Sequence, residues 1–272
     1  MITIRKRLSR LVMMALVPLL LCQATSCGVD EKKEENNPED QPAAAVTIVP
    51  AKPGVGVGRV MPAAEEPNGI IIYIDPGHGF MDGGTGDGIL ADGLLEKDIN
   101  MAIALKLSED LAMLGYTAKL THDGENLPPA AVNDHIFNAY ERADYANSLT
   151  MDYFISIHVN SAQNPDAEGS RIYYYDSSNK VKKVGGTVAE LMGKAIEKTL
   201  PDDPDPVIVD QSLDPYNAFI LCNQVNAPSA LVEVGFCTNK NDAQKMVSEN
   251  WQEKFAQSLA NGIDEYFTEY AE

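Results

Sequence analysis

Two histidines each follow a run of residues that is typical of a buried strand. His78 comes just after Ile70–Asp75, and His158 comes directly after Tyr153–Ile157. Apolar, β-branched and aromatic runs of this kind indicate strands that are covered on both faces. In open α/β sheets, ligands bind outside the carboxyl ends of the strands, where both imidazoles are expected. One such histidine is more often structural, but two together indicate a metal site, because neutral imidazole is a common zinc ligand.

Glu96 is the candidate for a third ligand. It opens a predicted helix after the Gly- and Asp-rich loop Phe80–Asp92, which leaves His78 and could fold back over the same strand end. The aspartates of this loop would repel phosphate, so a solvated loop at the rim of a site is expected, not a phosphate-binding loop. A helix start favours a carboxylate, and alone Glu96 would be read as an ordinary helix-start acid. With the two histidines it completes the three protein ligands that catalytic zinc usually has.

A fourth candidate is Glu233, an acid inside the apolar run Leu231–Phe236. A buried, unpaired carboxylate is costly, so this side chain needs either a partner or a function. Beside a bound zinc ion it could act as a general base toward water. The alternative is an ion pair across the sheet, with Arg142 or Lys240 as the partner.

Four blocks, in this order, resemble the zinc-dependent N-acetylmuramoyl-L-alanine amidases, the amidase type 3 family. The blocks are Asp75–Gly79, Glu96–Asp98, Ser156–Asn160 and Leu231–Phe236. The resemblance covers about residues 70–267. It implies that His78, Glu96 and His158 bind Zn²⁺, and that Glu233 is the catalytic acid/base. These are the residues that the strand ends and the buried charge also indicate.

The resemblance also implies a reaction and its partners. Members of the family hydrolyse the amide between the lactyl group of muramic acid and L-alanine, so peptidoglycan is the expected substrate. Some members need an activator protein, which is a further candidate partner, and no nucleotide cofactor is implied. Asn160, just past His158, either hydrogen-bonds the substrate or only orients its loop. Two rivals stay open: another zinc peptidase that acts on the stem peptide, and an inactive peptidoglycan-binding lipoprotein.

The chain departs from the family pattern at two places. The family often has Thr-Arg-Asp where this chain has Thr121-His122-Asp123, and often has arginine where this chain has Cys222. Both departures concern substrate contacts and leave the predicted ligand set intact. The other two histidines, His122 and His135, are expected on the solvent side.

The order of apolar runs predicts a single α/β domain with a mixed, mostly parallel sheet of about six strands flanked by helices. The predicted strands are Ile70–Asp75, Tyr116–Thr121, Tyr153–Ile157, Arg171–Tyr175, Asn217–Leu221 and Ala230–Val234. The predicted helices are a helix from Glu96 ended by Gly115, then Asn133–Asn147, Val184–Leu200 and Trp251–Phe267.

The first 26 residues read as a signal peptide, with a basic start and the apolar run Leu11–Leu21. That run is shorter than the ~20 residues that span a bilayer. Ala24-Thr25-Ser26-Cys27 resembles a lipobox, which predicts an exported lipoprotein anchored through a lipid on Cys27, in the periplasm or at the outer membrane. The alternative is an ordinary signal peptide cut near Ala24 or Ser26. Residues 27–68 are acidic and rich in Pro and Gly, as expected for a disordered tether, and 69–272 form the predicted catalytic domain.

The net charge and the cysteine positions bear on the possible partners and on disulfide pairing. The chain has 21 Lys and Arg against 40 Asp and Glu, a net charge of −19, which argues against a nucleic-acid partner. Cys222 and Cys237 flank a predicted antiparallel turn at Ala227-Pro228. That register would not place them opposite each other, so two free, buried cysteines are expected.

Overall fold

The computed structural model describes residues 67–85, 95–128, 136–175, 180–214, 216 and 218–271 of the chain. The predicted signal peptide, almost all of the predicted tether, and His135 lie outside the described residues. Within the described residues, no helix combines the length and the apolar character that crossing a membrane requires.

Six strands form one sheet, in the order β2-β1-β3-β6-β4-β5. Their bounds are β1 Ile71–Pro76, β2 Thr117–Leu120, β3 Tyr153–Asn160, β4 Arg171–Tyr174, β5 Val207–Asp210 and β6 Ser229–Phe236. All neighbours pair in parallel except β4 and β6, which pair antiparallel. The predicted mixed, mostly parallel sheet of an α/β fold is therefore confirmed.

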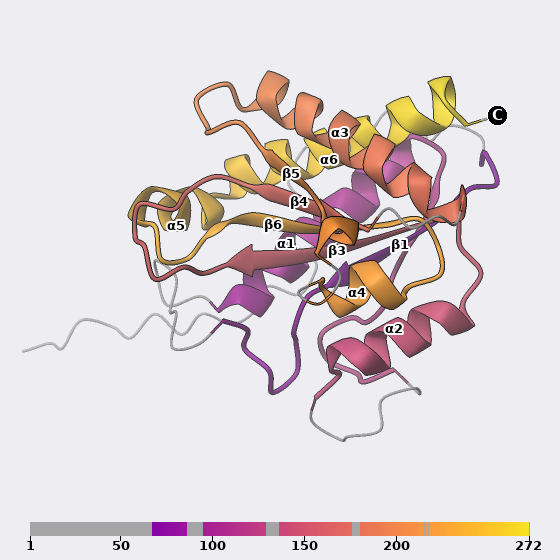
Figure 1. Cartoon of the computed structure of the whole chain (residues 1–272), viewed down its shortest axis with the longest axis horizontal. Coiled ribbons are helices and arrows are strands. Elements are labelled where there is room, and N and C mark those ends of the chain that lie inside the picture. The colour runs from indigo at the N-terminus through magenta and orange to yellow at the C-terminus, as the bar shows by residue number, and fades with distance from the viewer. Residues whose placement is uncertain are drawn as a thin grey trace, which may run out of the picture. The chain divides into compact units, whose positions relative to one another are not determined.

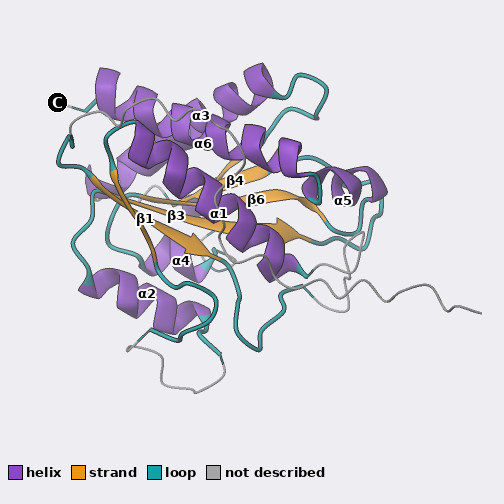
Figure 2. Ribbon diagram, turned by 180° about the vertical axis from the view of Figure 1, so that it is seen from behind, coloured by secondary structure: helices purple, strands orange, loops and turns teal. Residues whose placement is uncertain are grey.

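Helices cover both faces of the sheet (Figures 1 and 2). The helices α1 (Glu96–Met113), α3 (Lys180–Thr199) and α6 (Glu249–Glu269) pack on one face, and α2 (Ala139–Ser148) and α4 (Ile220–Gln224) on the other. The short helix α5 (Lys240–Met246) follows β6, and a 3-10 turn, Gln211–Leu213, follows β5. The sheet is thus the middle of three layers.

Side-chain alternation along the strands divides the interior into two cores. Ile72 and Ile74 of β1 belong to the larger core with α1, α3 and α6, whereas Tyr73 belongs to the smaller core under α2 and α4. Successive residues of a strand point to opposite faces. Asp75, two residues after Tyr73, and Glu233, two residues after Leu231 of the smaller core, therefore lie on the face that α2 and α4 cover.

Local sequence signals explain two helix boundaries, one of which agrees with the prediction and one of which differs from it. Gly115, with φ +90°, follows α1, and the amide of Tyr116 donates to the carbonyl of Leu111, which is the bond pattern of a glycine-terminated helix. The helix predicted from Asn133 begins instead at Ala139. Asn138 caps it, because its side chain accepts hydrogen bonds from two amides of the first turn.

The predicted strand Asn217–Leu221 is wrong. Ile220 and Leu221 lie in α4, which buries Leu221 and Cys222 in the smaller core. An apolar run this short fits a buried helical turn as well as a strand, and periodicity cannot separate the two. The sixth strand is instead β5, a short run with three β-branched residues that sequence reasoning did not assign as a strand. Both cysteines are free, as predicted, but Cys237 is half-buried where burial was expected.

Close packing of α3 against α6 gives a test of this layer. A Cβ added at Gly262 of α6 would lie 2.5 Å from the backbone nitrogen of Met192 in α3. We expect Gly262→Ala to lower the free energy of unfolding by about 1–3 kcal/mol, because the helices must separate to admit the methyl group. Urea unfolding measures this change. Asn261→Ala, an exposed neighbour on the same helix, is the control and should lose no stability; an equal effect of both variants would contradict the packing argument.

Candidate metal centre

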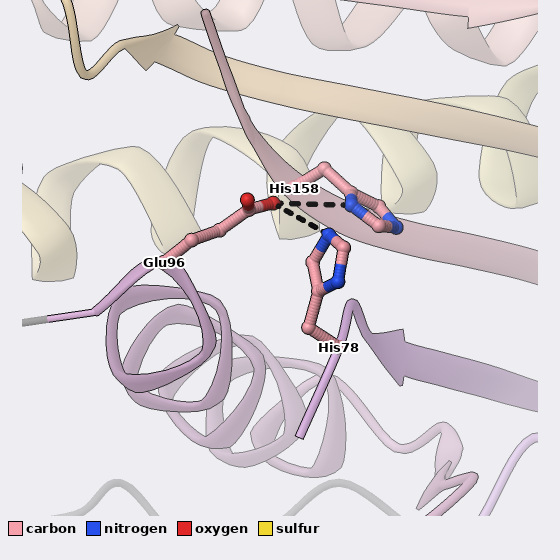
Figure 3. A group of neighbouring side chains, drawn as sticks. All are labelled: His78, Glu96 and His158. Carbon is pink, nitrogen blue, oxygen red and sulfur yellow. Dashed lines mark hydrogen bonds and ion pairs between the residues drawn. The ribbon is translucent and has the colours of Figure 1, made fainter. Parts of the chain in front are cut away.

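His78, Glu96 and His158 converge at the carboxyl edge of the sheet (Figure 3). Oε1 of Glu96 lies 3.2 Å from Nε2 of His78 and 3.2 Å from Nδ1 of His158. The two rings meet edge to face, with centroids 4.9 Å apart. Each side chain offers one ligand atom, and these atoms all lie within 4.8 Å of one another. Residues from the turn after β1, from α1 and from β3 thus form one cluster of donors.

The donor set fits a tetrahedral zinc ion. Zinc binds imidazole nitrogen and carboxylate oxygen at about 2.0–2.2 Å, which places ligand atoms of a tetrahedron about 3.3–3.6 Å apart. The two measured separations of 3.2 Å from Oε1 of Glu96 are close to this spacing. Nitrogen and carboxylate donors are also the types that zinc accepts.

His78 is held in an unusual backbone conformation. Its φ is +62°, a region that non-glycine residues rarely adopt and that is over-represented at functional sites. Gly79 and Asp82 then exchange two backbone hydrogen bonds of 2.9 Å, which close a tight turn. Nδ1 of His78 donates to Oδ2 of Asp82 at 2.8 Å, which leaves Nε2 as the ring nitrogen that faces Glu96. Such a carboxylate–histidine contact orients metal ligands in known sites.

Glu96 is fixed by backbone amides. The amide of Val159 donates to Oε1 at 2.9 Å, and the amide of Thr85 donates to Oε2 at 2.6 Å. Asn100, one turn further along α1, donates to the carbonyl of Gly77 at 3.0 Å and to Oε1 at 3.3 Å. The carboxylate therefore cannot rotate freely, although it lies at the start of a helix.

Two glycines make room for these side chains. A Cβ at Gly77 would lie 2.4 Å from Cε1 of His158, and a Cβ at Gly84 would lie 2.4 Å from Oε2 of Glu96. No real Cβ approaches that closely, so the ring and the carboxylate occupy space that only glycine leaves. Nε2 of His158 is buried and has no hydrogen-bond partner among the described residues.

The charges of the cluster favour a bound cation. Burial acts to lower the pKa of His78, but the carboxylates of Glu96 and Asp82 raise that pKa to about 9. Burial likewise acts to raise the pKa of Glu96, and the two imidazoles hold it well below its usual value. A carboxylate that stays ionised in a buried position is stabilised by positive charge beside it.

Glu233 stands opposite His158 on the neighbouring strand β6. It is 7% exposed, and its Oε2 is buried without a hydrogen-bond partner among the described residues. Burial raises the pKa of Glu233 to about 7, which is a suitable value for a group that exchanges protons near neutral pH. The alternative of an ion pair with Arg142 is wrong, because Arg142 pairs with Asp75; Lys240 is exposed at the start of α5.

Arg142 clamps the turn that carries His78, a contact that sequence reasoning missed. Its Nη1 donates to Oδ1 of Asp75 at 2.7 Å and to the carbonyl of Pro76 at 3.0 Å, and its Nη2 donates to the carbonyl of His78. Its Nε donates to the carbonyl of Phe137 at 2.7 Å. One guanidinium thus holds three successive points along the end of β1. No local pattern predicts this contact, because Arg142 and the end of β1 are far apart in the chain.

The partner of Arg142 is itself fully satisfied. Asp75 is fully buried, and its carboxylate accepts from Oγ1 of Thr121 at 2.6 Å and from Oγ of Ser156 at 2.8 Å. Burial acts to raise the pKa of Asp75, but Arg142 and the two hydroxyl groups hold it below its usual value. The carboxylate is therefore ionised in the folded protein.

The prediction that His122 lies on the solvent side is wrong. The residue is 6% exposed, its Nε2 donates to the carbonyl of Pro76 at 2.7 Å, and its Nδ1 accepts from the amide of Gly124 at 3.1 Å. Burial lowers its pKa, so the ring is neutral in this tautomer. The polar residues around it in the sequence concealed this second support for the end of β1.

Asn160 lies at the end of β3, after an irregular register between His158 and Asn160. Its Oδ1 accepts from the amide of Ser161 at 2.8 Å, and its carbonyl accepts from the amide of Cys237 at 2.9 Å. Irregular pairing of this kind often lies beside active sites, where it redirects side chains. The residue is thus near the cluster and half-buried.

Comparisons with known proteins agree on one family. The family described as N-acetylmuramoyl-L-alanine amidase matches residues 72–265. The Germination-specific N-acetylmuramoyl-L-alanine amidase of Bacillus subtilis is 29% identical over 207 residues, which cover 74% of this chain and 81% of that protein. The uncharacterized protein YqiI of Bacillus subtilis is 31% identical over 208 residues, or 75% of this chain and 88% of that protein.

Solved structures give the same result. The CwlD amidase of Clostridioides difficile, in complex with the GerS lipoprotein, is similar with a TM-score of 0.61 and 26% identity. The match covers 73% of this chain and 98% of that chain.

The buried Asp75–Arg142 pair yields a prediction with a defined pH dependence. We expect Arg142→Met to lower the free energy of unfolding by about 3–5 kcal/mol at pH 7, because the variant leaves an unpaired buried carboxylate. In the wild type the pKa of Asp75 is lowered on folding, so this carboxylate adds stability above its unfolded pKa, and that stability is lost as pH falls. In the variant the two hydroxyl groups remain but the charge of Arg142 is gone, so burial, the largest influence, raises the pKa of Asp75 and the stability falls as pH rises.

Chemical unfolding of both proteins at pH 7 and near pH 4 tests the sign. The stability deficit of Arg142→Met should be largest at pH 7 and should shrink in acid. A deficit of the same size at both pH values would show that the lost contribution is packing and not charge. Lys194→Gln, at an exposed position of α3, serves as the control for removing a cation.

Proposed function

The chain belongs to the N-acetylmuramoyl-L-alanine amidase family, and from this membership we propose that it is a zinc-dependent enzyme that cleaves peptidoglycan between muramic acid and L-alanine. The observation that carries the proposal is the convergence of His78, Glu96 and His158 on one point at the carboxyl edge of the sheet. We assign these three residues as the metal ligands and Glu233 as the catalytic acid/base. Bound zinc supplies Lewis-acid chemistry, polarising a carbonyl and making water acidic near neutral pH.

The residues of the chain then divide the work. Asp82 holds the ring of His78, and backbone amides hold Glu96, so the ligand atoms are preorganised. Glu233 takes a proton from the attacking water and delivers it to the nitrogen of the leaving amine, so that the C–N bond breaks as a C–O bond forms. The products are the lactyl carboxylate and the free amino group of L-alanine. Asn160 is the candidate substrate contact at the end of β3.

Removal of the acid/base gives the sharpest test. We expect Glu233→Gln to lower the rate of peptidoglycan hydrolysis by about 10²–10⁴-fold, because an amide cannot exchange the proton. Its metal content should equal that of the wild type, whereas His158→Ala should lose both the metal and the activity. Chelation should abolish turnover of the wild type, and added Zn²⁺ should restore it. Elemental analysis and mass spectrometry of the released fragments provide the measurements.

The products also decide between the rival functions. Free stem peptides that begin with L-alanine support the amidase, whereas cleavage within the peptide would identify a peptidase. Binding of peptidoglycan by the wild type without turnover, in the presence of Zn²⁺, would identify a binding protein. Because the Clostridioides difficile relative was solved with the GerS lipoprotein, the purified chain is assayed alone first. Turnover without an added protein would show that the enzyme needs no activator protein.

We also propose that the enzyme is exported to the cell envelope and anchored there by a lipid on Cys27, with residues 27–68 as a tether for the catalytic domain 69–272. The lipobox-like residues before Cys27 support this arrangement. One acyl chain binds a membrane only weakly, so stable anchoring needs more than one chain on the cysteine.

Fractionation of cells tests the anchor. We expect Cys27→Ala to move the protein from the membrane fraction to the soluble fraction, because the proposed lipid is attached to the thiol of Cys27. Blotting of both fractions measures the shift, and Cys222→Ala is the matched control that should stay on membranes. Continued membrane association of Cys27→Ala would contradict lipid anchoring.

A further inference from the structure

Arg171 lies one strand beyond Glu233, on the side away from His158. It opens β4 and lies opposite Glu233 in the antiparallel pairing of β4 with β6, and Glu233 in turn lies opposite His158 of β3. Neighbouring strands are about 4.7–4.9 Å apart, so each step of this row leads about 5 Å further from the candidate metal ligands. His158, Glu233 and Arg171 therefore follow one another across three adjacent strands.

The charge of Arg171 acts to lower the pKa of Glu233, but Arg171 does not hold the carboxylate in a salt bridge, although the two residues stand directly opposite each other. Opposite charges in such positions usually attract. Yet no ion pair of Arg171 occurs among the residues that the structure describes. Its guanidinium carbon instead lies 5.0 Å from the ring centroid of Phe236, and its Nε is buried without a hydrogen-bond partner. The aromatic ring holds the planar group in place, and its donors have no partner among the described part of the chain.

The guanidinium of Arg171 lies in a site that is rich in carboxylates. Asp82, Glu96 and Glu233 place three carboxylates at the site, and the chain as a whole carries a net charge of −19. An anionic ligand would be repelled here unless a cation met it. A guanidinium presents paired N–H donors that match the two oxygens of a carboxylate.

The proposed reaction fixes which part of the substrate reaches Arg171. Glu233 delivers its proton to the amine of L-alanine, so the leaving peptide lies on the Glu233 side of the metal ligands. Arg171 is one strand further in that direction. A peptide extends about 3.3–3.6 Å per residue, so the residue after L-alanine falls within reach. In stem peptides this residue is D-glutamate linked through its side chain, and its α-carboxyl group is either free or amidated.

We propose that Arg171 binds the free α-carboxylate of the second stem-peptide residue and makes the enzyme selective for stem peptides that are not amidated there. This inference rests on the proposed amidase function. A charge-assisted hydrogen bond contributes about 1.5–3 kcal/mol, which corresponds to a preference of about 10–100-fold. The alternative, that Arg171 acts only on the charge of Glu233, would affect both forms of the substrate alike.

Two matched substrates test the proposal. They are N-acetylmuramoyl tripeptides that differ only in an α-carboxylate or an α-carboxamide on the second residue, and kcat/KM is measured for each. The wild type should prefer the carboxylate by about 10-fold or more, and Arg171→Gln should reduce that ratio to about one. Arg171→Lys, which keeps the charge but not the paired donors, should give an intermediate ratio. The ratio is internal to each protein, so a smaller folded fraction does not change it.

The outcomes distinguish a failure of the role proposed for Arg171 from a failure of the proposed amidase function. Equal kcat/KM values of the wild type on both substrates would overturn the role of Arg171 while leaving the amidase function standing. A ratio that survives in Arg171→Gln would do the same, even with a lower rate on both. Lack of cleavage of either substrate by the zinc-loaded wild type would overturn the proposed function, and this inference with it. Lys194→Gln should keep the wild-type ratio.

Discussion

The buried ion pair between Asp75 and Arg142 determines where the first strand stops and how His78 is presented. It joins the central strand β1 to α2, and the same guanidinium holds the carbonyl of His78. His78 has a positive φ, a conformation that persists only when surrounding contacts enforce it. The pair is costly to desolvate, so its value lies in fixing one geometry at the strand end.

Two carboxylates beside His78, those of Glu96 and Glu233, lie in different electrostatic environments. Glu96 stays ionised because two imidazoles and two backbone amides face it. Glu233, on β6, is buried with no hydrogen-bond partner for Oε2 among the described residues, and it holds its proton more tightly. Two carboxylates thus acquire opposite tendencies from their environments alone. That difference suits one of them to hold a cation and the other to exchange a proton.

The sequence allowed the fold class and the clustering of His78, Glu96 and His158 to be predicted, because strand ends and buried charge are local signals. Contacts that depend on packing across the sheet could not be predicted in this way. The clamp of Arg142 on His78 joins segments far apart in the chain, and the buried position of His122 is hidden by its polar neighbours. The apolar residues near Leu221 fit a helix and a strand equally well, and only the smaller core decides between them.

The three donors come from separate elements, which couples metal binding to folding. His78 lies in the turn after β1, Glu96 begins α1 and His158 lies in β3, so they meet only when the sheet has assembled. An unfolded chain offers no ready-made chelate, and ion binding then adds its free energy to the native state alone. Under the proposed function, a newly made chain would have no hydrolytic activity until it has folded, and metal supply would raise its thermal stability.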